Sequence, residues 1–240
     1  MRYAIFGDIH ANLEAFEAVL EHANSLGCQE FVCLGDIVGY NANPSECLEK
    51  VRELGCPVVR GNHDDDSSKL KTGGNTNPVA KAAQEWTFNK LTEEQRAWLQ
   101  SLRYVRQVDN FTIVHASLDH PQQWHYVTNK FDAIASIAYQ FTQLCFVGHS
   151  HVPQIYVRGE SVEQHDRLDI IMEEGKKYLV NIGSVGQPRD GDWRASYCVY
   201  DTETGQIAIQ RIEYDIATAQ EKIIAEGLPQ SLAARLAEGA

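Results

Sequence analysis

The sequence predicts an α/β protein in which two sheets form a sandwich. Residues 2–60 alternate apolar, strand-like runs with helix-like runs, and this β-α-β-α-β order favours parallel strands. From about residue 104 onward, strand-like runs follow one another with few helices between them. Several apolar runs also end directly in Asp, Asn or His, at the strand end where open α/β sheets hold their sites.

The first sixty residues carry clear helix and strand signals. Asn12 suits a helix N-cap, apolar residues then recur at helical spacing, and Gly27 ends that helix. Asn43-Pro44 begins a second helix, because proline is favoured in a first helical turn. The elements that we expect are a strand over 2–7, a helix over 13–26, a strand over 31–34, a helix over 43–54 and a strand over 58–60.

The rest of the chain is less regular. Residues 65–78 are polar, with Gly73-Gly74, and predict a loop, whereas Thr92 and Gln95 match a capping box. We expect helices over 79–91, 92–102 and 130–142, strands at 111–114, 144–147, 154–157, 177–180, 196–200 and 206–212, a hairpin turn at 202–205, and a C-terminal helix over 216–238, interrupted at 227–229. With no linker visible, we predict a single domain over 1–240, with a helical insertion at about 65–108.

Composition excludes several classes of function. The formal net charge of −12 repels polyanions, so we expect no long nucleic acid as a partner. No apolar run approaches the roughly 20 residues of a membrane span, and no secretory signal precedes the first strand. The six scattered cysteines favour buried free thiols over a disulfide framework, which predicts a cytoplasmic protein. The oligomeric state is left open.

Five apolar runs end in side chains that bind metals. One such event is unremarkable, because a lone buried His is usually a core residue and a lone Asp after Gly usually belongs to a turn. Five such blocks at the same end of successive strands are poorly explained as core residues and turns alone. The five blocks are Asp8-Ile9-His10, Gly35-Asp36, Gly61-Asn62-His63-Asp64, His115, and Gly148-His149-Ser150-His151.

These residue types suit a pair of divalent ions. Imidazole nitrogens and carboxylate oxygens fit Mn, Fe, Zn, Co or Ni, among which we favour Mn. One carboxylate can bridge two ions roughly 3.5–4 Å apart, a spacing that suits displacement at phosphorus. Two such ions also supply the local positive charge that a small phosphorylated substrate needs inside an acidic protein.

The five ordered blocks resemble the calcineurin-like metallophosphoesterase superfamily, and the later stretch Asn181–Arg189 resembles its small bacterial and archaeal phosphodiesterase branch. The resemblance implies a four-layer α-β-β-α sandwich of two mixed sheets. It implies that Asp36 bridges two metals, that His63 acts near the leaving-group oxygen as an acid or charge stabiliser, and that Asp64 orients His63. The implied ligands are Asp8, His10 and His151 for one ion, and Asn62, His115 and His149 for the other.

The function expected from this resemblance is hydrolysis of phosphodiester bonds in small phosphorylated substrates. In the mechanism that the resemblance implies, both metals would lower the pKa of a shared water, and the hydroxide would attack phosphorus in line with the leaving oxygen. The alternatives are a phosphomonoesterase, a protein Ser/Thr phosphatase, a dinucleoside polyphosphate hydrolase, or a non-catalytic metal-binding scaffold. Asp65 follows the third block where protein phosphatases of the superfamily carry Arg, which weakens that option.

Three residues are weaker candidates for substrate contacts. Arg189 lies in a Gly-rich turn and could bind a phosphate with two nitrogens, or pair with Asp190 or Asp192 at the surface. Tyr40, just past the predicted bridging ligand, suits either a stacking or a packing role. Asn12 is either a substrate contact or only the helix cap.

Overall fold

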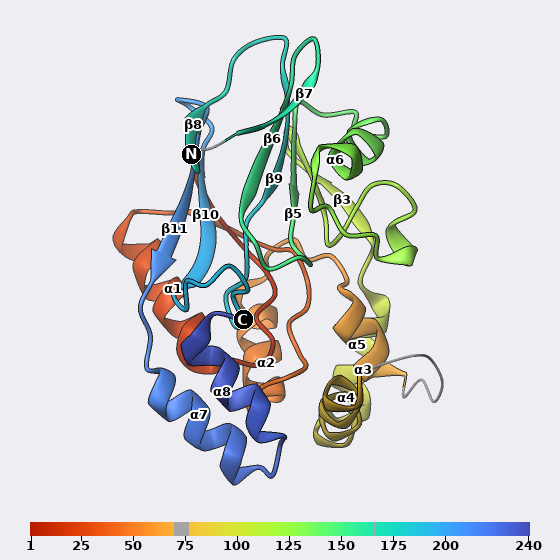
Figure 1. Ribbon diagram of the computed structural model, residues 1–240, viewed down its shortest axis with the longest axis vertical. Coiled ribbons are helices and arrows are strands. Elements are labelled where there is room, and N and C mark those ends of the chain that lie inside the picture. Colours follow the sequence, from red (N-terminus) through yellow and green to blue (C-terminus); the bar gives the residue numbers. More distant parts are fainter. Residues whose placement is uncertain (70–76, 166) are drawn as a thin grey trace.

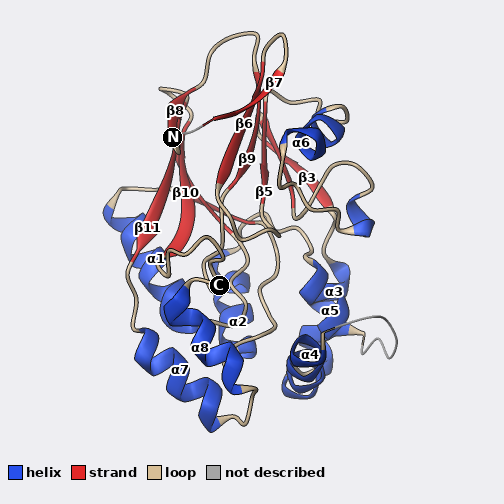
Figure 2. Cartoon of the chain, viewed as in Figure 1, coloured by secondary structure: helices blue, strands red, loops and turns tan. Residues whose placement is uncertain are grey.

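Two mixed sheets lie face to face in the structure, with helices on their outer faces (Figures 1 and 2). The computed structural model describes residues 1–69, 77–165 and 167–240. Its helices are α1 (Leu13–Ser25), α2 (Pro44–Leu54), α3 (Asn62–Ser68), α4 (Pro78–Lys90), α5 (Glu93–Ser101), the 3-10 turn η1 (Pro121–Gln123), α6 (Lys130–Ile137), α7 (Ile216–Ala225) and α8 (Gln230–Glu238). Its strands are β1 (Arg2–Phe6), β2 (Glu30–Cys33), β3 (Val105–Val108), β4 (Phe111–Val114), β5 (Leu144–Val147), β6 (Gln154–Arg158), β7 (Val162–His165), β8 (Asp169–Ile171), β9 (Lys177–Asn181), β10 (Ala195–Asp201) and β11 (Gln206–Ile212).

The strand orders show how distant segments meet. One sheet has the order β2-β1-β10-β11-β8, and the other has the order β3-β4-β5-β9-β6-β7. In the first sheet β1 and β2 run parallel, and in the second β4, β5 and β9 run parallel. The remaining pairs are antiparallel, so both sheets are mixed.

Three apolar clusters hold the layers together. Side chains such as Ile5 and Val32 from one sheet pack between the sheets against Phe111 and Phe146 from the other. The outer face of the first sheet packs on α1 and α2, and that of the second packs on α6. This is the predicted four-layer α-β-β-α sandwich, and apolar burial on both faces of each sheet explains why the strands read as continuous apolar runs.

A fourth cluster connects the C-terminal helices to the rest. Helices α7 and α8 pack together with Ala83 of α4 and with Tyr40, which follows β2. The expected C-terminal helix is therefore two helices, separated at the interruption that the sequence shows over 227–229.

Four expectations about elements need correction. Val58 and Val59 form only isolated bridges, one to Cys33 and one to Arg103, so they make no third strand. The predicted loop at 65–78 begins instead as α3, because Asp64 and Asp65 in the first turn favour a helix N-terminus; Gly73-Gly74 lies outside the described residues.

The expected helix over 130–142 ends earlier, at Ile137. The side chain of Gln140 is buried there and donates to the carbonyls of Thr142, Gln143 and Tyr178. These bonds stabilise a loop at this position and not a further helical turn. Strands β3, β7 and β8 were not among the expected strands, since residues such as Arg106, Glu163 and Asp169 give them little apolar character. The expected single domain with its helical insertion stays a prediction.

The cysteines agree with the sequence-based expectation. All six cysteines are free, and five of them are buried, as predicted. In the described part of the chain, no helix combines the length and the apolar character required to cross a bilayer.

Candidate metal centre

The predicted metal-binding side chains converge at the ends of four strands. Asp8 and His10 follow β1, Asp36 follows β2, His115 follows β4, and His149 and His151 follow β5. They form two groups, in each of which the possible ligand atoms lie within 4.8 Å of one another. The first group is Asp8, His10, Asp36 and His151, and the second is Asp36, His115 and His149. Asp36 is common to both, and every member is buried.

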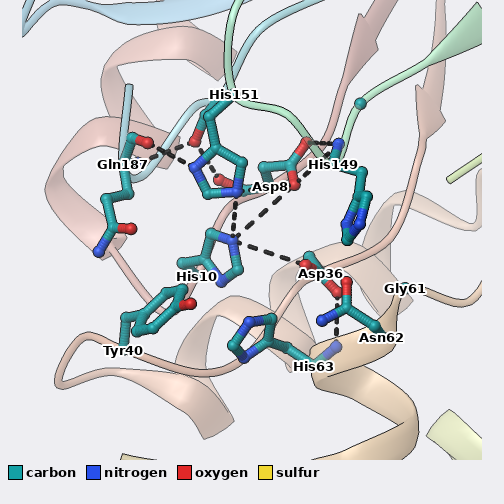
Figure 3. Close-up of polar contacts among 12 residues, drawn as sticks. Asp8, His10, Asp36, Tyr40, Gly61, Asn62, His63, His149, His151 and Gln187 are labelled. Atoms are coloured by element: carbon teal, nitrogen blue, oxygen red, sulfur yellow. Dashed lines mark hydrogen bonds and ion pairs between the residues drawn. The ribbon is translucent and has the colours of Figure 1, made fainter. Parts of the chain in front are cut away.

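Distances within the groups are short (Figure 3). His10 Nε2 lies 3.1 Å from His151 Nε2, which in turn lies 3.2 Å from Asp8 Oδ1. Asp36 Oδ2 lies 3.6 Å from His10 Nε2 and 3.3 Å from His115 Nε2. Asn62, the first residue of α3, brings its Oδ1 to 3.2 Å from His115 Nε2 and so joins the second group.

Backbone carbonyls fix the tautomers of four histidines. The Nδ1 atoms of His10, His115 and His151 contact the carbonyls of Val38, Leu34 and Gln187 at 3.2, 2.8 and 2.6 Å, and His149 Nε2 contacts the carbonyl of Trp124 at 3.0 Å. A carbonyl only accepts hydrogen bonds, so each of these nitrogens carries the proton. In a neutral imidazole the other nitrogen then has a lone pair, the arrangement found around metal-bound histidines.

This donor set fits divalent cations. In neutral His10 and His151, both facing Nε2 atoms have lone pairs, and at 3.1 Å those lone pairs repel each other unless a cation binds both. Two buried carboxylates, Asp8 and Asp36, lie beside them, and uncompensated buried carboxylates are costly. Imidazole and carboxylate together suit borderline divalent ions.

The backbone at the site adopts an unusual conformation. Asp8, His10, Asp36, His149 and His151 all have φ between 48° and 68°, a left-handed region that non-glycine residues seldom adopt. Such residues cost of order 1–3 kcal/mol each and persist where the surrounding structure holds them, typically at functional sites. Five of them in one buried cluster indicate that the backbone is arranged to aim these side chains.

The pKa shifts of the buried residues agree with this donor set. Burial lowers the pKa of His10 and His63 below the ordinary range, and burial together with His115 lowers the pKa of His149 to about 3. Burial also opposes the charge on His115, but the Asp36 carboxylate outweighs it and raises that pKa to about 9. For Asp36 burial raises the pKa, yet His115 prevails and holds it well below its usual value. Most of the imidazoles therefore stay neutral and keep their lone pairs.

The Asp64 carboxylate binds backbone N–H groups of two neighbouring turns. Its carboxylate accepts hydrogen bonds from the backbone N–H groups of Asp36, Ile37 and Gly61 at 2.8, 2.9 and 3.0 Å. His63 Nδ1 is buried and has no hydrogen-bond partner among the described residues. The Asp64 carboxylate thus connects the turn that presents Asp36 to the start of α3, and an orienting effect of Asp64 on His63 stays a prediction. Burial and the neighbouring Asp36 raise the pKa of Asp64 to about 7.

His63 lies beside the first group and next to two candidate substrate residues. Its backbone N–H donates to Asp36 Oδ1 at 2.8 Å, and its ring centre lies 4.9 Å from that of His10 and 4.4 Å from that of Tyr40. The Arg189 guanidinium lies 5.8 Å from the centre of the Tyr40 ring and donates to Gln187 Oε1 at 2.8 Å. Tyr40, His63 and Arg189 thus form one flank of the centre.

The contacts of the neighbouring residues bear on the alternatives left open for Arg189 and Asn12. Asp190 pairs with Arg211 and Asp192 with Arg194, so neither forms the surface ion pair that we considered for Arg189. Asn12 is buried; its Oδ1 caps α1 by accepting from the Ala15 N–H at 3.1 Å, and its Nδ2 donates to the Gly186 carbonyl at 3.0 Å. These bonds and the burial of Asn12 favour the helix-cap role, and a substrate contact of Asn12 stays a prediction.

Sequence reasoning missed the residues that support the histidines. Gln187 and Trp124 act through backbone carbonyls, which leave no trace in the identity of the side chain. Tyr126, whose ring stacks on His149 at 4.1 Å, carried no metal-type signal either. Only their positions, shortly after the His115 block and inside the Asn181–Arg189 stretch, could have drawn attention to them.

Known proteins are similar to this chain in sequence and in fold over nearly all of its length. The chain is 40% identical over 237 residues to an uncharacterised protein of Methanocaldococcus jannaschii, covering 97% of this chain and 96% of that protein. The crystal structure of a metallophosphoesterase from Sphaerobacter thermophilus superposes with a TM-score of 0.89 at 39% identity, covering 100% of this chain and 99% of that one.

A more distant relative carries a specific name. It is a symmetrical bis(5′-nucleosyl)-tetraphosphatase of Glaesserella parasuis, 33% identical over 130 residues, which are 52% of this chain and 47% of that protein. The calcineurin-like phosphoesterase superfamily domain matches residues 1–205. The chain therefore belongs to the calcineurin-like phosphoesterase superfamily and is a metal-dependent phosphoric ester hydrolase.

Proposed function

We propose that this protein binds two divalent ions and hydrolyses phosphodiester bonds of small phosphorylated substrates. Asp8, His10 and His151 would hold one ion, Asn62, His115 and His149 the other, and Asp36 both. The observation that carries the proposal is that the two groups of ligand-type atoms share Asp36. Bound there, the ions would polarise the phosphoryl oxygens and make a water nucleophilic at neutral pH.

Side chains of the protein would act on the leaving group and bind the phosphate. His63 lies beside the first group, its Nδ1 has no hydrogen-bond partner among the described residues, and we assign it to the leaving-group oxygen. The Arg189 guanidinium has no carboxylate within 4 Å among the described residues, so its charge is available to a phosphate. Tyr40 lies between them and holds the guanidinium over its ring.

Two further assignments belong to this proposal. Manganese is the favoured metal, because the mixed imidazole and carboxylate set suits a borderline ion. A cytoplasmic location agrees with six free thiols, five of them buried, as expected in a reducing compartment.

A dinucleoside polyphosphate hydrolase is the second candidate function. The named relative from Glaesserella parasuis favours it, although the similarity spans only about half of each chain. A protein Ser/Thr phosphatase is less well supported, because Asp65 replaces the expected Arg and pairs with buried Arg60 at 2.9 Å. A non-catalytic scaffold is opposed by the complete set of buried ligand-type side chains.

Hydrolysis assays on the Mn-loaded protein test the proposal. We expect cleavage of bis(p-nitrophenyl) phosphate, and faster cleavage of this diester than of the monoester p-nitrophenyl phosphate. Faster cleavage of the monoester would make the protein a phosphomonoesterase. Protein that holds Mn yet cleaves neither compound nor a dinucleoside tetraphosphate would favour the scaffold.

A further inference from the structure

The loop between β4 and α6 places two aromatic side chains on the second flank of the centre. The Trp124 ring lies 6.0 Å from the His115 ring, and the Trp124 carbonyl accepts the His149 Nε2 hydrogen. The Tyr126 ring stacks on His149 at 4.1 Å with an interplanar angle of 22°. A third ring, Tyr104, lies 5.6 Å from Trp124. We call Tyr104, Trp124 and Tyr126 the aromatic shelf.

The shelf is held in place but faces solvent. Tyr126 is 51% exposed although one face of its ring covers His149, while Tyr104 and Trp124 are partly buried. Buried Arg60 donates to the Tyr104 hydroxyl at 3.1 Å and lies 4.8 Å from the ring centre, which fixes that ring. Trp124 has φ of 56°, a strained value that its hydrogen bond to His149 helps to maintain.

A hollow of about 410 Å³ adjoins the shelf. It is lined by Tyr104 and by residues 120–123, which immediately precede Trp124. His120, Gln122 and Gln123 give it polar side chains that can bond the ring nitrogens and carbonyl oxygens of a heterocycle. The hollow therefore suits a planar heterocycle better than a purely apolar group.

The position of the shelf relates it to the reaction. Tyr40, His63 and Arg189 flank the centre beside His10, whereas the shelf adjoins His115 and His149; Figure 3 shows Tyr40 and His149 on opposite sides of the two carboxylates. A phosphodiester bound at the centre would direct one ester arm toward each flank. In a protein with net charge −12, contact with rings can add affinity without requiring further positive charge.

We propose that the aromatic shelf binds a nucleobase-like ring carried by one ester arm of the substrate, stacked on the free face of Tyr126. The inference rests on the proposed function and names the substrate class as nucleotide esters. Stacking of a base on an aromatic side chain is tolerant of base identity, so selection among the bases should be weak.

Binding to the Mn-loaded protein, measured by calorimetry, tests the shelf without relying on turnover. Adenosine 5′-monophosphate carries both a phosphate and a base, and inorganic phosphate carries no base. For Tyr126→Ala we expect the Kd of the nucleotide to rise by about 5- to 100-fold, the range of one lost stacking contact, while the Kd of phosphate is unchanged.

Two variants control the experiment. Tyr126→Phe keeps the ring and should retain nucleotide binding, and Tyr139→Ala removes a tyrosine of similar exposure, 54%, just beyond α6. Mn content, measured by elemental analysis, should be the same in all variants.

Different outcomes separate the shelf from the proposed function. Equal affinity of the wild-type protein for nucleotide and phosphate would overturn the shelf and leave the phosphate site intact. Loss of Mn from Tyr126→Ala would also overturn it, because the ring would then serve His149 and not the substrate. Binding of neither compound by the wild-type protein would overturn the proposed function, and the shelf with it.

Discussion

Asp36 is the residue on which both groups of ligand-type atoms depend. Its Oδ2 faces His10 and His115, and its Oδ1 accepts the backbone N–H of His63. We predict that Asp36→Asn lowers the Mn content below two ions per chain and reduces diester hydrolysis by more than about 100-fold, because both ions lose an anionic ligand. Elemental analysis and the bis(p-nitrophenyl) phosphate assay measure the two effects.

The control for this prediction is Asp201→Asn, which removes a carboxylate paired with Arg2. Full Mn content in Asp36→Asn would refute the shared role of Asp36.

His63 is predicted to act on the leaving group and not on the metals. His63→Ala should keep its Mn and lose about 10²- to 10⁴-fold in rate on diesters with poor alkoxide leaving groups, the usual contribution of a general acid. The loss should be smaller for p-nitrophenyl esters, because p-nitrophenolate leaves without needing a proton. An equal loss on both kinds of ester would assign His63 to charge stabilisation, and a loss of Mn would make it a ligand.

At the scale of residues, the sequence predicted which side chains meet but not how they are held. His10, Asp36 and His149 could be identified because each follows an apolar run. The carbonyls of Val38, Leu34 and Gln187, which set the histidine tautomers, belong to the backbone and carry no signal of residue type. The bonds of Asp64 could not be predicted for the same reason, since these partners are backbone N–H groups.

At the scale of elements, the turn after β5 must pass very close to Asp8. A Cβ atom on Gly148 would collide with Asp8 Oδ2, which already accepts the His149 N–H at 3.0 Å. We predict that Gly148→Ala weakens Mn binding by about 10- to 100-fold, as expected when the support of a ligand is disturbed. Metal titration measures this. Gly159→Ala is the matched control, because nothing lies within 4 Å of the added atom; equal Mn affinity in both variants would contradict the argument.

Elements with strong local signals could be predicted, and those that depend on tertiary pairing could not. The capping box of α5 and the Asn12 cap of α1 are local features, and both occur as expected. Strand β8 forms because Ile170 pairs with Ile207 of β11. The three residues of β8 alone do not predict this pairing. Val58 and Val59 do not form a strand because each makes only an isolated bridge, Val58 to Cys33 and Val59 to Arg103.

At the scale of the whole molecule, the fold joins the centre from segments that are distant in the chain. Asp8 and His151 are separated by more than half of the sequence, yet His151 Nε2 lies 3.2 Å from Asp8 Oδ1. The two sheets contribute opposite sides of the site, since β1 and β2 lie in one sheet and β4 and β5 in the other. Ions bound at this junction would therefore tie the sheets together, and they should stabilise the folded chain as a whole.

This coupling predicts that metal binding raises the melting temperature. A ligand at 100 times its Kd stabilises the native state by about 2.7 kcal/mol for each site, and a chain of this size gains roughly 2–4 °C for each kcal/mol. Two ions should thus raise Tm by about 10–20 °C relative to chelator-treated protein, as followed by calorimetry or circular dichroism. In Asp36→Asn the rise should shrink to less than half, because both sites lose a ligand, whereas Asp201→Asn should show the full shift. A Tm that Mn leaves unchanged, in protein shown to bind Mn, would mean that the ions do not bridge the two sheets.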